Sequence, residues 1–298
     1  MSDLLIRGMA AGGMVRFVAV QTTETVEHMR LVHHTLPLAT AALGRALTAC
    51  GMMGDDIKKE DGSVTLQIRG GGPLGSITAV SDSHGNTRGY LQNPAVELPL
   101  RPDGKLDVGG GVGCDGVLTV IRDMGEGEPF SGRVELRSGE IAEDVAAYFA
   151  VSEQVPTVCA LGVLVGRDQS VSCAGGFLLQ LMPGADDALI TELEERIAAF
   201  GSVTAHLQKG DIEQAMADLY GDMDYEILDR HPIAYRCKCS RAKVEQALLS
   251  MGREELLKLA HSQPEAHVTC QFCDADYAFT RDELLALLEP GKKAEKCK

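Results

Sequence analysis

Short alternations of hydrophobic and polar residues dominate the first 184 residues of the chain. Residues 14–22 are rich in β-branched side chains and predict a strand. Val64, Leu66 and Ile68 alternate with polar neighbours, as in a strand with one buried face. The same reasoning predicts strands near residues 77–80, 88–92, 117–122, 133–137, 156–165 and 170–181. The first three strands after residue 60 follow one another across short turns, which suggests an antiparallel meander.

Hydrophobic residues recur at helical spacing in two early segments. Thr25 is a predicted helix cap before Val26 and Met29, and Pro37 opens a second run that reaches about Met53. Leucine and alanine form a narrow face in this second run, which suits close packing. Together the pattern predicts the α+β fold class, with a large N-terminal domain of helices and sheet over residues 1–184.

Residues 185–230 have a different composition and are predicted to form a helical, acidic linker. This region holds two predicted amphipathic helices, and residues 186–230 contain 12 acidic and 3 basic side chains. Like charges crowd the exposed helix faces, so we expect the linker to dock only marginally and to unfold locally. The apolar positions of the two helices are Leu189, Leu193, Ile197 and Phe200, then Ile212, Met216 and Leu219.

Residues 231–298 are predicted to be a small C-terminal domain that depends on a metal. Short helices are expected at residues 241–249 and 253–259, and residues 277–288 predict a strand followed by a helix. A segment of roughly 70 residues with few large apolar groups builds little hydrophobic core. Structural zinc contributes roughly 10–16 kcal/mol of apparent binding energy in small peptides, which would supply the missing stability.

Two closely spaced cysteine pairs carry the strongest chemical signal in the chain. Cys237 and Cys239 form a Cys-x-Cys motif, and Cys270 and Cys273 form a Cys-x-x-Cys motif. Each pair can occupy two positions around a tetrahedral ion, so together they predict a closed, four-sulfur zinc site. Four thiolates in a reducing compartment can also act as a redox switch. A disulfide between Cys237 and Cys239 would close a very small ring, so it is expected to be strained and easily reduced.

Neighbouring side chains leave alternatives open at this site. A histidine could replace one sulfur, and a basic patch beside the first motif could contact nucleic acid. The alternative for the patch is that its cations offset the negative charge of a zinc-tetrathiolate centre. The histidines are His231, His261 and His267, and the patch consists of Arg236, Lys238, Arg241 and Lys243.

The remaining composition favours a cytoplasmic protein. Nine cysteines form an odd set, and five of them lie outside the paired motifs: Cys50, Cys114, Cys159, Cys173 and Cys297. Such usage argues against a secreted disulfide scaffold. No positively charged leader and no membrane-spanning apolar run is recognisable, so we expect a soluble protein of the cytoplasm.

The charge and the glycine motifs disfavour three kinds of partner: nucleic acid, anionic membranes and dinucleotides. A net charge of −15 repels nucleic acid and anionic membranes, so neither is expected as a partner. The glycines of residues 111–116 match a dinucleotide-binding motif, but a predicted strand follows them where that motif requires a helix.

With these residues laid out, the chain resembles the heat-shock protein 33 family of redox-regulated chaperones over nearly its whole length. The resemblance rests on short motifs in all three predicted regions as well as on the paired cysteines. These motifs are residues 5–9, 42–48, 72–75, 138–144, 152–154, 174–176, 222–226, 236–241 and 270–273.

The resemblance implies a non-enzymatic holdase that needs no ATP and binds unfolding client proteins. The reduced form is expected to be a monomer that holds zinc through Cys237, Cys239, Cys270 and Cys273. Oxidation is expected to form the disulfides Cys237–Cys239 and Cys270–Cys273, to release zinc and to unfold the linker. Dimerisation and client binding by the N-terminal domain would follow.

Two other functional classes remain open at the level of sequence. One is a zinc-ribbon adaptor that binds nucleic acid, which a salt-dependent shift of DNA or RNA would reveal. The other is a thiol-disulfide oxidoreductase, which would turn over a small disulfide substrate and need an exposed thiol of low pKa.

Overall fold

The computed structural model describes residues 2–288 and divides the chain into two compact units, Met1–Arg236 and Cys237–Lys298. The mixed architecture confirms the predicted α+β class. The domain boundaries predicted at residues 184 and 230 remain predictions. In the structure, the chain from residue 185 to Arg236 belongs to the first compact unit. Cys297 lies outside the described residues. No helix within residues 2–288 has the length and apolarity needed to cross a membrane.

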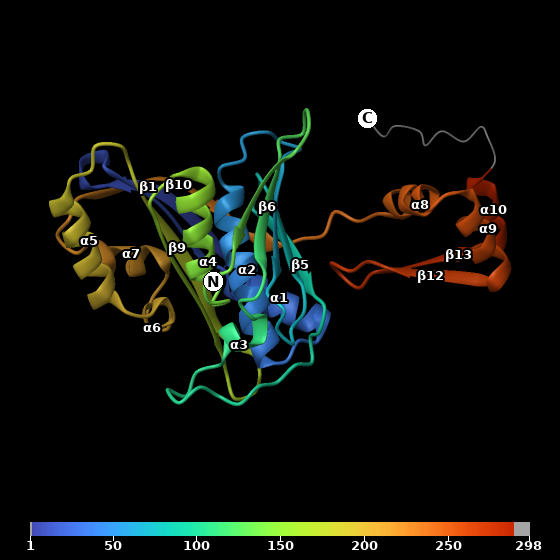
Figure 1. Ribbon diagram of the computed structural model, residues 1–298, viewed down its shortest axis with the longest axis horizontal. Coiled ribbons are helices and arrows are strands. Elements are labelled where there is room, and N and C mark those ends of the chain that lie inside the picture. Colours follow the sequence, from blue (N-terminus) through green and yellow to red (C-terminus); the bar gives the residue numbers. More distant parts are fainter. Residues whose placement is uncertain (1, 289–298) are drawn as a thin grey trace. The chain divides into compact units, whose positions relative to one another are not determined.

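An antiparallel sheet of five strands, in the order β10-β1-β2-β9-β8, forms one layer of the first unit (Figure 1). Its strands are β1 (Leu4–Ala10), β2 (Val15–Gln21), β8 (Thr157–Val165), β9 (Val171–Leu181) and β10 (Tyr225–Pro232). The strand predicted at residues 14–22 is confirmed as β2. Neither β1 nor β10 was predicted from the sequence, although both lie at the same edge of this sheet.

A second sheet has six strands in the order β11-β5-β4-β3-β6-β7. Its strands are β3 (Ser63–Arg69), β4 (Ile77–Asp82), β5 (Asn86–Leu91), β6 (Val117–Asp123), β7 (Phe130–Glu135) and β11 (Ala234–Tyr235). The predicted meander is confirmed, because β3, β4 and β5 pair in succession and antiparallel. The strand predicted after the glycine motif of residues 111–116 is confirmed as β6.

Helix α2 (Pro37–Gly54) packs against strands of both sheets. All of its residues except Pro37 and Arg45 are buried. The narrow face of leucine and alanine predicted from the sequence is therefore one side of a helix that is enclosed on all sides. Gly44 and Gly51 permit this close approach, because an added Cβ would lie 2.7 Å from Val26 and 2.5 Å from Ile233, respectively. Three more helices complete this part: α1 (Thr23–His33), α3 (Val108–Val112) and α4 (Ala142–Tyr148).

The five-stranded sheet is apolar on both faces. Val18 and Val20 of β2 belong to the hydrophobic cluster around α2, whereas Phe17 and Ala19 of the same strand belong to a second cluster on the other face. The helices of the predicted linker cover this second face. They are α5 (Asp187–Phe200), α6 (Val203–Leu207) and α7 (Ile212–Tyr220).

The predicted linker is helical only as far as Tyr220. Beyond it the chain forms β10, which pairs with β1 along its whole length and so extends the sheet. Both predicted amphipathic helices are present, as α5 and α7. The region is therefore more firmly integrated into the first unit than the expectation of marginal docking implied.

The second unit contains three helices and one hairpin within residues 237–288. Its elements are α8 (Arg241–Ser250), α9 (Arg253–Ser262), β12 (Glu265–Thr269), β13 (Asp276–Thr280) and α10 (Arg281–Leu287). The buried core consists of Leu248, Leu256, Ala260, Ala266, Phe279 and Leu284. Six buried residues are too few for much independent stability, in line with the small core predicted from the sequence.

Tyr235 fixes the end of the first unit to the six-stranded sheet. Its hydroxyl donates to the carbonyl oxygen of Gly89 at 2.9 Å and lies 2.9 Å from His33 Nε2. The ring stacks on His28 with 5.4 Å between centroids. The chain is therefore anchored two residues before Cys237, where the second unit begins.

We expect Tyr235→Phe to lower the free energy of unfolding of the first unit by about 1–2 kcal/mol, because buried polar groups lose their partner. Tyr225→Phe is the matched control, since its hydroxyl has no hydrogen-bond partner within residues 2–288, and it should cost less than about 0.5 kcal/mol. Urea denaturation of both variants measures the difference. Equal losses would show that the Tyr235 hydroxyl is not an anchor.

Candidate metal centre

Two short backbone segments hold the paired cysteines. Cys237 and Cys239 precede α8, whose N-cap Ser240 accepts a hydrogen bond from the backbone N–H of Lys243. Cys270 and Cys273 lie in the turn between β12 and β13. There the backbone N–H of Cys273 donates to the carbonyl oxygen of Cys270 at 3.3 Å. The helix cap and the hairpin turn thus present one thiol pair each.

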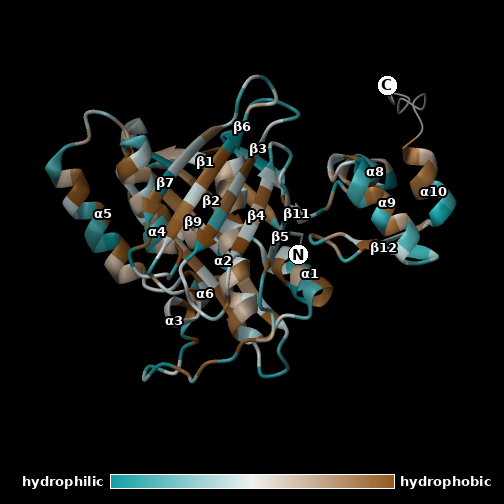
Figure 2. Ribbon diagram, turned by 45° about the vertical axis from the view of Figure 1, so that its right-hand side comes forward, coloured by the Kyte–Doolittle hydropathy of each residue, from teal (hydrophilic) through white to brown (hydrophobic). Residues whose placement is uncertain are grey.

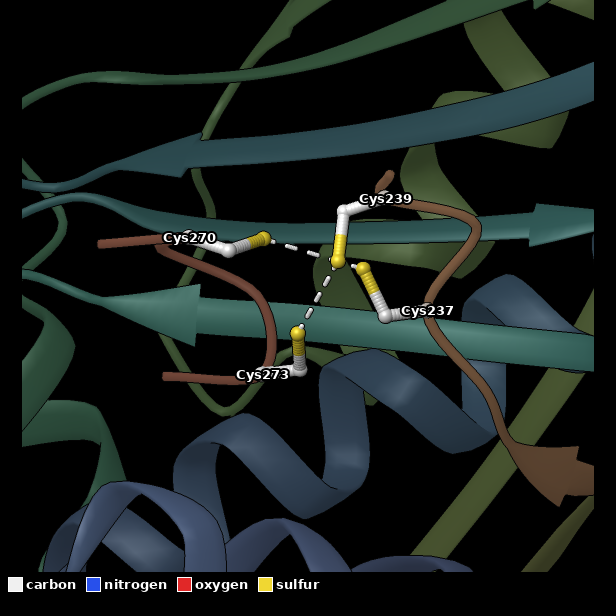
Figure 3. Close-up of side chains that lie close together, drawn as sticks. All are labelled: Cys237, Cys239, Cys270 and Cys273. Carbon is white, nitrogen blue, oxygen red and sulfur yellow. Dashed lines mark hydrogen bonds between the residues drawn. The ribbon is translucent and has the colours of Figure 1, made fainter. Parts of the chain in front are cut away.

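The four sulfur atoms converge on one point (Figure 3). All four Sγ atoms lie within 4.8 Å of one another. Cys237 and Cys270 are 3.7 Å apart, and Cys239 and Cys273 are 3.3 Å apart. These distances exceed a disulfide bond of about 2.05 Å. A tetrahedral ion with metal–sulfur bonds of about 2.3 Å would separate its ligands by about 3.8 Å, so the group is consistent with a metal site.

None of the candidate histidines joins this group within the described residues. His261 Nδ1 lies 2.7 Å from the carbonyl oxygen of Leu257, and His267 Nδ1 lies 2.6 Å from Asp276 Oδ2. His231 belongs to β10 in the first unit, where its Nε2 is 3.5 Å from Asp55. The four-sulfur set is therefore the arrangement that the structure supports over a set with one imidazole.

Tyr277 makes the four thiols inequivalent. Its hydroxyl donates to Cys239 Sγ at 3.1 Å, and this hydrogen bond lowers the pKa of Cys239 to about 7. Burial instead raises the pKa of Cys237 and Cys273. Without a cation among them, four thiols this close cannot all be ionised at the same time, because neighbouring thiolates repel one another. A cation among them would remove that repulsion, and a soft divalent ion suits sulfur ligands.

Tyr277 was not singled out in the sequence analysis, because its only visible feature there is its place in a predicted strand. The hydrogen bond arises because β13 follows the Cys270–Cys273 turn and returns beside the first cysteine pair. Only the pairing of β12 with β13, which was not predicted, brings residue 277 within reach of Cys239.

Arg241 of the predicted basic patch supports the structure of the unit. Its guanidinium lies 4.2 Å from the centre of the Phe279 ring and donates to the carbonyl oxygen of Ala278 at 2.8 Å. It also donates to Glu283 at 2.7 Å. These contacts tie the start of α8 to β13 and α10, so this cation is already committed to partners inside the unit.

The other described cysteines lie apart from the cluster in the first unit. Burial raises the pKa of Cys50 to about 12, and it also raises the pKa of Cys159 and Cys173. Cys114 is exposed. Buried thiols of raised pKa are poor nucleophiles and poor metal ligands, so these positions do not extend the site.

Comparisons with known proteins agree with this fold and site. The family model described as Hsp33 protein matches residues 3–280. The chain is 46% identical over 296 residues to the 33 kDa chaperonin of Clostridium perfringens, which covers 99% of this chain and 93% of that protein. It is likewise 46% identical over 285 residues to the 33 kDa chaperonin of Agathobacter rectalis, covering 95% and 99% of the two chains.

A solved structure of the same kind shares the fold. The crystal structure of the 33 kDa chaperonin of Thermotoga maritima superposes with a TM-score of 0.89 at 37% identity, covering 97% of this chain and 98% of that chain. The sheet-and-helix body with its small four-cysteine unit thus defines a molecular chaperone of a non-enzymatic class. The chain belongs to the Hsp33 family, which confirms the resemblance noted in its sequence.

We expect the purified, reduced protein to carry one zinc ion per chain and Cys273→Ser to lose it, because three sulfurs no longer close a tetrahedral site. Cys114→Ser is the matched control and should retain the ion, since Cys114 is exposed in the other unit. Mercurial release of zinc with a colorimetric indicator measures the stoichiometry. Zinc retained by Cys273→Ser as tightly as by the control would exclude the four-sulfur site.

Proposed function

We propose that this chaperone is a redox-regulated, ATP-independent holdase of the cytoplasm. Cys237, Cys239, Cys270 and Cys273 act as its zinc ligands and as its redox-active thiols. The observation that carries the proposal is the convergence of these four sulfurs in a unit whose described residues, 237–288, include only six buried core residues. A chain of the Hsp33 family with this arrangement has a stabilising element that an oxidant can remove.

In the reduced state the four thiolates would hold zinc between the start of α8 and the β12–β13 turn. Bound zinc supplies a crosslink between these two segments and leaves no open position for substrate. The residues of the chain position the ligands: Ser240 caps α8, and Tyr277 donates to Cys239. The stability of the unit then depends on a ligand set that must stay deprotonated and reduced.

In the oxidised state we propose the disulfides Cys237–Cys239 and Cys270–Cys273. Each pair of thiolates gives up two electrons to hydrogen peroxide or hypochlorite, which takes two protons from solvent and is reduced to water or to chloride and water. The closest sulfurs in the structure belong to different motifs, at 3.7 and 3.3 Å, so pairing within each motif requires the site to rearrange. The family resemblance and the short spacing within each motif favour this pairing.

Loss of the ligand set removes the main support of the second unit. Disulfide sulfurs bind zinc poorly, and six buried residues do not compensate for it. We propose that unfolding then spreads through the linker and uncovers the apolar face of the five-stranded sheet around Phe17 and Phe177. An exposed apolar surface of this kind can bind unfolding proteins.

The proposed partners follow from this surface. Clients are unfolded or partly folded proteins, and the oxidised chain is proposed to form a homodimer while the reduced chain is a monomer. The net charge of −15 disfavours nucleic acid and anionic membranes as partners.

We expect treatment with peroxide or hypochlorite at mildly elevated temperature to release zinc, to increase binding of a hydrophobic dye and to suppress aggregation of a heat-denatured client. Cys114→Ser should respond like the unmodified protein, because Cys114 lies outside the cluster. Light scattering of the client and dye fluorescence measure the response. Equal suppression by the fully reduced, zinc-loaded protein would contradict redox control, and turnover of a small disulfide substrate would indicate an oxidoreductase instead.

A further inference from the structure

The three helices of the linker are not equally well packed. Only Leu193 and Phe200 are buried among the 14 residues of α5, whereas five of the nine residues of α7 are buried. Helix α5 also lies at the margin of the first unit in both views (Figures 1 and 2), and hydrophilic residues alternate with hydrophobic ones along its ribbon in Figure 2. The free energy that holds α5 against the sheet is therefore smaller than the free energy that holds α7.

A cavity of about 310 Å³ lies between α5 and the strands beneath it. Val15, Val158 and Leu179 form part of its wall on the strand side, and Ile190 and Ile197 contribute from α5. The space is lined mainly by apolar atoms and is partly open to solvent. Atoms that face a void lose the dispersion contacts of a close-packed interface, so α5 covers this part of the sheet without filling it.

The C-terminal end of α5 is fixed more firmly than its middle. The Phe200 ring packs edge-on against Phe177 of β9 and stacks on His206 of α6, with centroids 5.6 and 3.9 Å apart. Gly201 follows with a φ of 69°, a backbone conformation that glycine adopts without strain. A rotation at Gly201 would also displace Phe200, so opening of α5 means that the residues before Phe200 leave the sheet while Phe200 and α6 stay in place.

Arg196 provides the polar contact between the middle of α5 and the rest of the linker. Its Nη1 donates to the carbonyl oxygen of Tyr220 at 2.6 Å, and its Nη2 donates to Asp222 Oδ1 at 2.6 Å. Tyr220 is the last residue of α7, and its carbonyl oxygen also accepts from the backbone N–H of Met223 at 2.9 Å. The negative end of the helix dipole favours a cation at this position. Glu192, one turn earlier in α5, orients the same guanidinium at 2.7 Å.

We propose that Arg196 is a positioning residue that clasps α5 to the end of α7, and that α5 opens as a lid before α6, α7 and β10 separate from the sheet. Opening uncovers the buried strand residues Val15 and Leu179 beside Val158, which is already exposed, while the better packed part of the linker stays in place. The order of opening is inferred from the burial and contacts of the linker helices and does not depend on the proposed function. Its role, to offer clients a first apolar contact, rests on the proposed function.

Hydrogen exchange of the reduced, zinc-loaded protein tests the order of opening. Amides of α5 should exchange at least about tenfold faster than those of α7, and Arg196→Ala should accelerate α5 by about five- to tenfold more without changing α7. Arg230→Ala is the matched control, because Arg230 makes a comparable bidentate pair with Glu213 at 2.7 and 3.0 Å but does not touch α5.

The control should leave α5 exchange unchanged. Equal exchange of α5 and α7, or acceleration of both by Arg196→Ala, would overturn the proposal. So would an unchanged α5 in Arg196→Ala.

A second variant should slow the hydrogen exchange of α5 instead of accelerating it, and it leaves the Arg196 contacts unchanged. Val158→Leu adds one methylene group to the cavity wall and should slow exchange of α5, because it fills part of the void beneath the helix. Faster or unchanged exchange of α5 would contradict a packing defect as the cause. These experiments need no oxidant, so a chaperone that lacks redox control would refute the proposed function and leave the order of opening unaffected.

Discussion

A sheet with two apolar faces must be covered on both sides, and this constraint governs the rest of the molecule. Residues of β2 alternate between two hydrophobic clusters, with Val18 on one side and Phe17 on the other. Helix α2, which lies between β2 and β3 in the sequence, covers one face. The other face is covered by α5, α6 and α7, which follow β9 and precede β10. In the sequence, the helices that cover this face therefore lie between β9 and the four cysteines.

The cover and the sulfurs are connected through a segment that belongs to both sheets. Residues of β10 pair with β1, and β11 pairs with β5 immediately before Cys237. The pairing of β10 requires a close approach at Gly8, where an added Cβ would lie 2.0 Å from the carbonyl oxygen of Glu226. Loss of order at Cys237 can reach α7 by fraying β11 and then β10. In the proposed switch, Tyr235 would oppose the first step, so this anchor and the metal centre would together set its threshold.

Local patterns predicted most single elements but not their long-range partners. The meander after Val64 and the amphipathic helices of the linker follow from spacing, because side-chain periodicity is a local property. Strand β10 was missed because its residues alternate weakly and gain their order from pairing with β1, more than 200 residues away. Spacing likewise identified Cys237, Cys239, Cys270 and Cys273, whereas Tyr277 and Arg196 act through contacts that only the folded chain creates.

The central claim is that oxidation of the sulfur cluster removes order from the linker as well as from the small unit. Hydrogen exchange of the hypochlorite-oxidised protein, compared with the reduced protein, tests it most directly. The account predicts loss of protection in residues 187–220 together with residues 237–288, while α2 remains protected. An oxidised, client-binding protein in which residues 187–220 keep their full protection would contradict it.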